Sequence, residues 1–480
     1  MKALGREQRD LWEKRKKIPL TEAEAQRLEA LDADLTVARQ AFETLLADLR
    51  AAFSSTAPGG DRLAKLATEV GLQSDLADLG PGTVVLYTVV TDERYRVIVI
   101  TPETQVARDY PITAAALNCK VHAFREVLQT LGDGAPAFDP RPLAQELYRI
   151  LLGPVAQDLE GVNAQTLMWS LDGVLRYLPV AALHDGEHYL VERYRTVVYT
   201  DVSKARLKDM PQPTWTGLGL GVSQAHDPFP ALPAVPTELR GIIRDAGHPT
   251  DGVLAGTIKL DEAFTAKSMF TALRQGYPVV HIASHFHFRP GNNTESLLLL
   301  GDGSRLSLAE LHKQATLFHG VELLTLSACD TAMGDTKATG QEIDGFAMQA
   351  QQQGAKAVVA SLWPVADTST QALMQHFYRL RESQAGLPKV EALRQAQLAL
   401  LHGQEEKAPG PQVAALGVPP VAGEAVAMAT TLGDLRGEPE RQGQDSCGNE
   451  TVHRRFRPSA QAPYTHPYYW APFILIGNWK

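Results

Sequence analysis

The sequence predicts an α/β fold built on a mainly parallel sheet flanked by helices. The main observation is three apolar runs, at 278–285, 321–329 and 355–363. Strands that are covered by helices on both faces read as nearly continuous apolar runs, because neither face meets water. Helical patterns lie between and after the runs, and strands alternating with helices are typical of a parallel sheet. We therefore expect three neighbouring parallel strands at the centre of the molecule.

Composition narrows the class of protein. The 480-residue chain is 44% hydrophobic and 21% charged, with a formal net charge of −9, which argues against general nucleic-acid binding. It contains no run of about 18 apolar residues and no signal-peptide core near Met1, so we expect no membrane span and no secretion signal. Its three cysteines, Cys119, Cys329 and Cys447, are an odd and sparse set. We expect free thiols in a reducing cytoplasm.

Residues 1–78 are expected to form a helical segment. Thr21 and Glu24 have the spacing of a capping box, in which each side chain satisfies one N–H at a helix start. Between Leu28 and Leu49, apolar residues follow steps of three and four, as in a coiled-coil seam. The seam either packs on another helix of this chain, which we favour, or binds a regulatory protein partner.

Residues 80–210 are expected to form an α+β half. Runs rich in β-formers at 84–90 and 95–101 predict a hairpin. Cys119, in a helical stretch, is expected to be a core residue. The later elements are expected in the order helix, helix, hairpin and strand, at 113–131, 140–158, 165–178 and 189–200.

Residues 211–480 are expected to hold the α/β sheet. The glycine-rich run 217–221 lies inside a predicted strand and lacks the third glycine of a nucleotide loop, so we do not assign it to nucleotide binding. Residues 403–463, rich in Pro, Gly, Ala and Gln, predict a long flexible insertion, after which the apolar ending returns as a last strand. Besides the central strands we expect a strand at 216–222 and helices at 237–246, 261–275, 307–316, 342–353, 367–383 and 388–402.

Two central strands end on residues that can carry chemistry. His285 ends the first run and Cys329 ends the second, and the ends of parallel strands meet at one edge of the sheet. A cysteine attacks a carbonyl as its thiolate, which a nearby base generates. We therefore predict a cysteine hydrolase in which His285 takes the thiol proton and returns it to the leaving amine, while Cys329 forms the acyl-enzyme. Backbone N–H groups of Phe286 and Cys329 are candidates for stabilising the oxyanion.

The run from His281 onward resembles the CHAT family of caspase-like cysteine peptidases. The resemblance covers residues 80–480, and its motifs lie at 171–183, 280–285, 323–332, 354–367 and 469–479. It implies a caspase-like fold and an endopeptidase that cuts a protein substrate with a His285–Cys329 dyad and no cofactor. Trp363 and Asp367 match a segment that borders the substrate pocket in the related separase. If Asp367 lines that pocket, Arg or Lys before the cut would be favoured.

Departures from the family pattern leave other readings open. Phe286 stands where many caspase-like enzymes have glycine, and no tetratricopeptide pattern precedes residue 80. A catalytically silent scaffold is therefore the alternative function. His281, His285 and His287 share one face of an extended strand and would suit zinc, but no matching downstream ligands stand out, so we expect no metal. Residues 335–344 are expected to be a surface loop rather than a processing site.

Overall fold

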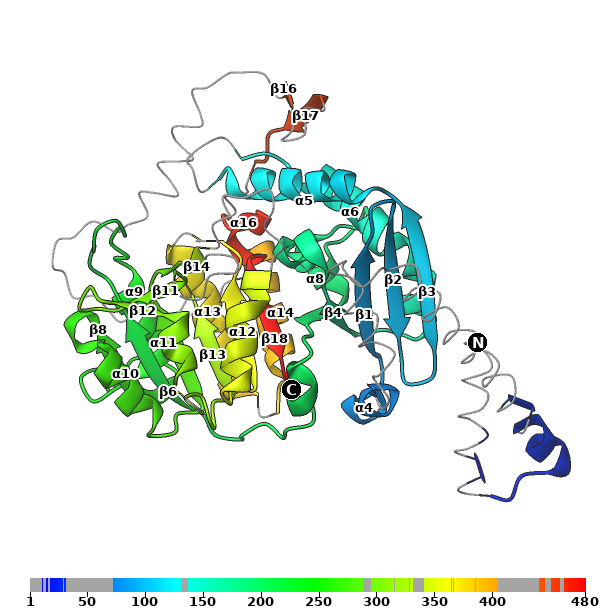
Figure 1. Ribbon diagram of the computed structural model, residues 1–480, viewed down its shortest axis with the longest axis horizontal. Coiled ribbons are helices and arrows are strands. Elements are labelled where there is room, and N and C mark those ends of the chain that lie inside the picture. The colour runs from blue at the N-terminus through cyan, green and yellow to red at the C-terminus, as the bar shows by residue number, and fades with distance from the viewer. Residues whose placement is uncertain are drawn as a thin grey trace.

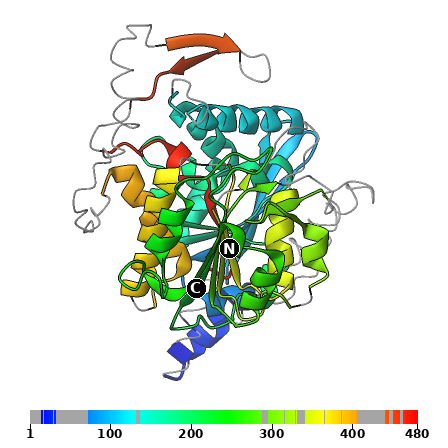
Figure 2. The same cartoon turned by 90° about the vertical axis from the view of Figure 1, so that its left-hand side faces the viewer.

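The computed structural model describes most of the chain after residue 71. The described residues are parts of 11–31, then 72–131, 137–287, 295–314, 316–327, 329–330, 341–363, 365, 367–384, 386–404, 440–444, 450–457 and 462–480. A twelve-stranded sheet runs through this part in the order β3-β2-β1-β4-β5-β18-β15-β13-β9-β6-β8-β7. Helices lie on both of its faces (Figures 1 and 2). The expected class, a mainly parallel sheet flanked by helices, is confirmed.

The first half of the sheet combines a meander with parallel strands. Its strands are β1 (Thr83–Val90), β2 (Arg94–Ile100), β3 (Gln105–Pro111), β4 (Thr166–Ser170) and β5 (Arg195–Val198). The predicted hairpin is confirmed, because β2 runs antiparallel to β1 and then to β3. On its other side β1 pairs in parallel with β4, and β4 with β5. Every residue of β4 is buried, as expected of a strand covered on both faces.

The second half contains the three predicted central strands as neighbours. They are β9 (Val279–Ala283), β13 (Leu323–Leu326) and β15 (Ala357–Ser361), and each is buried along its whole length. They are parallel to one another, and β9 also pairs with β6 (Thr216–Gly221), beyond which lie β8 (Leu254–Leu260) and β7 (Ile243–Arg244). The C-terminal ends of β6, β9, β13 and β15 therefore lie at one edge of the sheet.

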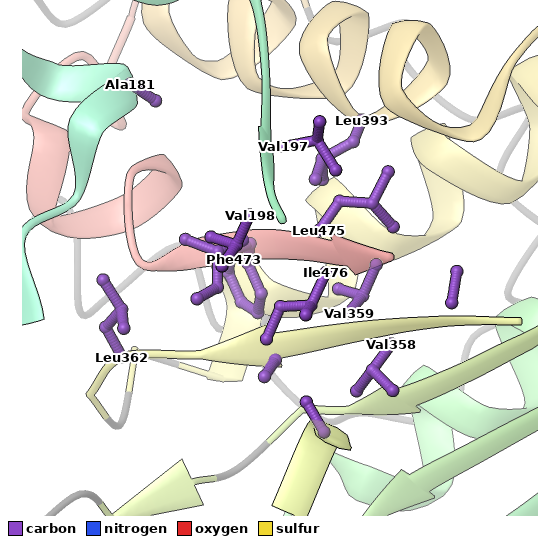
Figure 3. Packing of buried hydrophobic residues seen from close by; sticks show 14 of the residues in the cluster. Ala181, Val197, Val198, Val358, Val359, Leu362, Leu393, Phe473, Leu475 and Ile476 are labelled. Atoms are coloured by element: carbon purple, nitrogen blue, oxygen red, sulfur yellow. The ribbon is translucent and has the colours of Figure 1, made fainter. Parts of the chain in front are cut away.

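The last strand joins the two halves of the sheet. β18 (Phe473–Gly477) runs antiparallel to β15 and meets β5 through the parallel pair Ile476 and Val198. Figure 3 shows the apolar side chains of β5, β18 and β15 gathered at this junction. The aromatic ending thus returns to the core as predicted. The boundary between 80–210 and 211–480 stays a prediction, since both segments contribute to one sheet.

The helices begin where local hydrogen bonding favours a start. Thr113 accepts the Ala116 N–H at the start of α5, and Ser307 and Glu310 form a capping box at α11. Gly403, with φ 64°, ends α14 in the left-handed conformation. The helices are α4 (Leu72–Leu79), α5 (Ala114–Gln129), α6 (Arg141–Leu151), α7 (Ala156–Gly161), α8 (Leu190–Arg193), α9 (Val235–Ile242), α10 (Ala266–Leu273), α11 (Leu308–His312), α12 (Gln341–Gln352), α13 (Asp367–Ser383), α14 (Lys389–His402) and α16 (Pro467–Trp470).

Two strand predictions in the first half are wrong. There is no hairpin at 165–178, because β4 lies between two parallel neighbours and Gly173–Tyr177 forms a 3-10 turn. The Asp172 carboxylate accepts the Val90 N–H at 3.0 Å, which ties the start of that turn to the end of β1. The strand expected at 189–200 begins only at Arg195, because its first part is α8, where the Glu192 carboxylate accepts the Tyr189 N–H at 2.6 Å.

Helix boundaries in the second half also differ, and neither β7 nor β8 was predicted. The helix expected at 237–246 ends at Ile242 and is followed by β7, and α10 starts at 266 rather than 261. The strand β8 contains Gly256, and a glycine inside a short segment weakens the strand pattern of its sequence. A Cβ on Gly256 would lie 1.8 Å from the Gly217 carbonyl oxygen, so the close approach of β6 and β8 requires glycine.

Two further expectations, about the insertion and about Cys119, are wrong. Within 403–463, β16 (Glu440–Gln444) and β17 (Glu450–Arg454) form an antiparallel hairpin, although no regular structure was expected. The end of β17 is fixed to the segment before α6, because the Asp139 N–H donates to the Arg454 carbonyl at 2.8 Å. Cys119 is not a free core thiol: it is half-buried on α5 and disulfide-bonded.

The N-terminal segment is described only in part. The predicted capping box is confirmed, since the Thr21 N–H donates to the Glu24 carboxylate at 3.0 Å and the Glu24 N–H to the Thr21 hydroxyl at 3.4 Å. Most of the predicted seam at 28–49 and residues 335–340 of the loop expected at 335–344 lie outside the described residues, and 341–344 belong to α12 rather than to a loop. Among the helices that are described, none is long and apolar enough to cross a membrane.

Candidate functional site

A small second sheet extends the central strands at the edge where the predicted site residues lie. Its order is β12-β11-β10-β14, with β10 (Phe286–His287), β11 (Leu297–Leu299), β12 (Arg305–Ser307) and β14 (Cys329–Asp330). β10 follows β9, and β14 follows β13. In the parallel β10–β14 pair, Phe286 is the register partner of Cys329. The structure therefore brings the predicted histidine and cysteine segments to adjacent strand ends.

The strand register shifts by one residue between the two sheets, and His285 lies at the shift. Thr325 of β13 comes 44 residues after its partner His281, whereas Cys329 comes 43 residues after its partner Phe286. The histidine segment thus contains one more residue than the cysteine segment between the two ladders. An extra residue of this kind interrupts the ladder and changes the direction of a side chain, as a β-bulge does. His285 is accordingly outside both β9 and β10.

A backbone carbonyl fixes the proton position of the His285 ring. His285 Nε2 lies 2.8 Å from the Pro230 carbonyl oxygen, and the ring lies 5.2 Å from that of Phe229, centre to centre. A carbonyl oxygen can only accept, so Nε2 carries the proton of the neutral imidazole. Nδ1 then has the lone pair, and this nitrogen is the candidate base.

The loop that carries Pro230 is positioned by its strand. It follows β6, which pairs with β9, so it leaves the sheet beside His285. Arg305 of β12 holds the loop from the second sheet: its guanidinium donates to the Asp227 carbonyl at 3.1 Å and lies 5.6 Å from the centre of the Phe229 ring. This loop was not identified from the sequence. Its run of prolines after the strand next to His285 is the one local signal for it.

Backbone bonds from β11 fix the position of the histidine segment. The Ser284 hydroxyl donates to the Leu299 carbonyl at 2.7 Å, and the Leu299 N–H donates to the His285 carbonyl at 2.9 Å. Because polar backbone groups alternate in direction along a strand, the Phe286 N–H then points away from β11 and toward β14. The Phe286 N–H thus faces β14, the strand that pairs with β10.

Phe286, the main departure from the family pattern, is directed into the core. Its side chain is 1% exposed, and its ring lies 4.8 Å from that of Phe346 on α12, centre to centre. The bulky side chain is accommodated by packing under the site. In place of glycine it therefore adds core contacts while the main chain keeps its strand conformation.

Trp363 and Asp367, the predicted pocket residues, lie in the connection from β15 to α13. Trp363 follows β15 by two residues and is buried, with its indole N–H donating to the Tyr468 carbonyl at 3.2 Å. Asp367 is the first residue of α13, and its side chain lies outside the described part. Since β15 pairs with β13, this connection leaves the sheet beside the segment that leads to Cys329.

His281 belongs to a different, fully buried network. Its Nε2 lies 2.9 Å from the Glu238 carboxylate and its Nδ1 lies 3.3 Å from the Tyr378 hydroxyl, which also contacts Thr325 at 2.8 Å. Both ring nitrogens therefore have partners in the core, whereas His285 is bonded to Pro230 at the edge of the sheet. The three histidines of the strand do not converge. Within the described residues, no group of three or more candidate ligands could hold a metal ion.

Comparison with known proteins identifies the family. The CHAT domain model matches residues 141–478, which is more than half of the chain. The chain belongs to the CHAT family. Its α/β architecture is thus the caspase-like fold that the sequence motifs implied. No curated protein matches this CHAT chain.

Solved structures similar to this CHAT chain are distant in sequence. The Saccharomyces cerevisiae separase–securin complex is 10% identical with a TM-score of 0.43, over 70% of this chain and 30% of that chain. The Arg specific cysteine proteinase gingipain R is 10% identical with a TM-score of 0.33, over 60% of this chain and 70% of that chain. The complex of Porphyromonas gingivalis RgpB pro- and mature domains is 9% identical with a TM-score of 0.34, over 60% and 72%. The CHAT chain spans about 30% of the separase chain's length.

Proposed function

We propose that this CHAT protein is a cysteine endopeptidase that cuts peptide bonds in a protein substrate. The observation that carries the proposal is the His285 Nε2 bond to the Pro230 carbonyl, at 2.8 Å, beside the β10–β14 pair that contains Cys329. It assigns the lone pair to Nδ1 on the segment whose neighbouring strand begins with Cys329, and a cysteine nucleophile needs such a base. A buried histidine with both nitrogens engaged, such as His281, does not offer this.

The proposed reaction proceeds through a thioester. His285 Nδ1 takes the Cys329 thiol proton, and the thiolate sulfur forms a bond to the carbonyl carbon of the scissile peptide. The Pro230 carbonyl stabilises the imidazolium that results, because it already accepts the other ring proton. His285 then gives its proton to the leaving amine as the C–N bond breaks. Water, deprotonated by His285, hydrolyses the thioester to the new carboxylate and restores the thiol.

Stabilisation of the oxyanion is assigned to the main chain. The N–H groups of Phe286 and Cys329, which belong to register partners on adjacent strands, are the donors that we assign to the oxyanion. Backbone donors of this kind are fixed before the reaction and need no reorganisation during it. Trp363 and Asp367 are assigned to the wall of the substrate pocket.

The test compares hydrolysis by single-residue variants. An unfolded, dye-labelled protein and a peptide library serve as substrates. We expect Cys329→Ala and His285→Ala to lower kcat/KM by at least about a thousandfold, because each removes one member of a pair that acts as a unit. His287→Ala is the matched control, since this histidine lies two residues away in β10 and should keep activity within a few-fold. Hydrolysis that persists in both dyad variants would leave the scaffold function as the better account.

A further inference from the structure

Arg125 is a buried arginine that connects the first half of the CHAT chain to the predicted pocket. It lies on α5, is 3% exposed, and takes no part in the proposed chemistry. Burying a guanidinium costs free energy unless its N–H groups form hydrogen bonds, so the groups that Arg125 contacts indicate its role. One Nη donates to the Tyr177 carbonyl at 2.7 Å, and the other donates to the Leu362 carbonyl at 3.2 Å.

The two carbonyls belong to segments far apart in the sequence. Tyr177 ends the 3-10 turn Gly173–Tyr177, whereas Leu362 lies directly after β15. The guanidinium carbon also lies 5.3 Å from the centre of the Tyr177 ring and 5.5 Å from that of Trp363. One planar guanidinium therefore contacts two carbonyls and two aromatic rings. Arginine can do this because its N–H donors are spread over a flat group, whereas the compact ammonium of lysine cannot make all four contacts.

The connection that Arg125 holds is next to the nucleophile's strand. In the β13–β15 pair, Leu326 is opposite Ala360, so Leu362 and Trp363 leave the sheet beside the segment that ends at Cys329. Other contacts fix the connection on the side of the last strand: the Leu362 N–H donates to the Pro472 carbonyl at 3.0 Å, and Trp363 donates to Tyr468. Arg125 supplies the contact from the first half of the chain, and Figure 1 shows α5 at this end of the sheet beside α16.

We infer that Arg125 is a positioning residue that sets the part of the pocket wall formed by Leu362 and Trp363, and so makes substrate selection depend on the first half of the chain. The inference rests on the proposed function, because a pocket wall matters only to a protein that binds a substrate there. It predicts a specific loss. Without Arg125 the wall shifts, so peptides bind less well and side-chain preference weakens, while the His285 segment keeps its own contacts from the loop after β6 and from β11.

The test is Arg125→Met, with Arg381→Met as the matched control. Arg381 is 5% exposed, lies 4.6 Å from the centre of the Trp215 ring and donates to the Gln212 carbonyl at 3.3 Å. It has the same chemistry as Arg125, but it lies fourteen residues after the start of α13, about 21 Å along the helix from the pocket. Comparing the two variants thus separates the general effect of losing a buried arginine from the effect of losing the Arg125 contacts with Leu362 and Trp363.

Three readouts are compared on folded protein. We expect Arg125→Met to lower kcat/KM for peptides at least about tenfold, mainly through KM, with Arg125→Lys intermediate. Alkylation of Cys329 by iodoacetamide, which does not use the pocket, should stay within about twofold of the wild type. Amide hydrogen exchange in the peptide that covers 361–367 should accelerate in Arg125→Met and not in Arg381→Met.

Exchange at 361–367 that is unchanged in Arg125→Met would overturn the inference, whatever the activity. Equal losses of hydrolysis and of alkylation would also overturn it, because they would show a general effect on the dyad. A wild-type protein with no Cys329-dependent hydrolysis would instead contradict the proposed function, and the exchange measurement would still decide the role of Arg125.

Discussion

At the scale of single residues, His285 is defined by its position at a change in strand register. The extra residue between β9 and β10 takes its ring out of the ladder, and Pro230 then selects the tautomer. The histidine and the cysteine were both predicted from their positions at strand ends. The contact with Pro230 was not predicted, because every residue has a backbone carbonyl and the sequence does not show which one contacts the ring. Arg125 was missed for a similar reason, since its partners lie 52 and 237 residues away.

The Phe286 side chain yields a prediction that separates stability from catalysis. Phe286→Ala should lower the free energy of unfolding by about 3 kcal/mol, because it leaves a cavity beside Phe346. The N–H remains, so kcat/KM per folded molecule should change no more than a few-fold. Urea unfolding and active-site titration measure the two quantities. A loss of activity that exceeds the loss of folded protein would show that the side chain itself takes part in the reaction.

At the scale of elements, the apolar strands were predictable and the polar ones were not. β9, β13 and β15 are buried along their length, so their continuous apolar sequences predict them as strands. β3 is an edge strand with no fully buried residue, it carries Arg108 and Asp109, and its strand conformation comes from pairing with β2. The turn at 173–177 resembled a hairpin because periodicity does not reveal whether the next strand is parallel.

The start of α16 provides an element with a defined pH dependence. His466 is buried, and its Nδ1 accepts the Tyr468 N–H at 3.1 Å while Nε2 contacts the Phe138 carbonyl at 3.1 Å. Burial lowers the pKa of His466 to about 4. Since the folded pKa lies below that of the unfolded chain, protonation favours unfolding. Stability contributed by the neutral ring is present above pH 6.5 and is lost as the pH falls toward 4.

The expected loss from His466 is on the order of 3 kcal/mol between pH 7 and pH 4. His466→Asn keeps an acceptor for the helix start and removes the titrating ring, so its unfolding free energy should fall less steeply over this range. His188→Asn, at an exposed histidine, is the control and should retain the wild-type slope. Chemical unfolding at several pH values measures the slopes. Equal slopes in wild type and His466→Asn would refute the assignment of a neutral buried ring.

At the scale of the whole molecule, the two ends of the sheet have different roles. The C-terminal strand ends carry His285 and Cys329. The opposite end holds a buried ion cluster in which Lys356 and Lys389 face Glu322, with Lys389 Nζ 3.6 Å from the carboxylate. Burial lowers the pKa of Lys389 to about 8, and Glu322 opposes this shift. Lys389 also donates to the Lys480 carbonyl, so the end of the sheet that holds the ion cluster also fixes the C-terminus. The candidate site lies at the opposite end.

The arrangement of the two halves could be predicted only in part. Alternating strands and helices indicate a parallel sheet, but they do not give the order of its strands. The position of β18 between β15 and β5 depends on contacts between residues almost 300 positions apart, such as Ile476 and Val198. The disulfide bond of Cys119 and the hairpin β16–β17 were not predicted either, because composition pointed the other way for both.

The central claim, that His285 acts as the base for Cys329, is tested most directly by the pH dependence of alkylation. Iodoacetamide modifies the thiolate, and peptide mass analysis assigns the rate to Cys329 separately from the other cysteines. In the wild type we expect the midpoint of the rate to lie well below the value of about 8.5 for a free thiol, and in His285→Ala we expect it to move to about 8.5. The same midpoint in wild type, His285→Ala and the His287→Ala control would contradict the dyad.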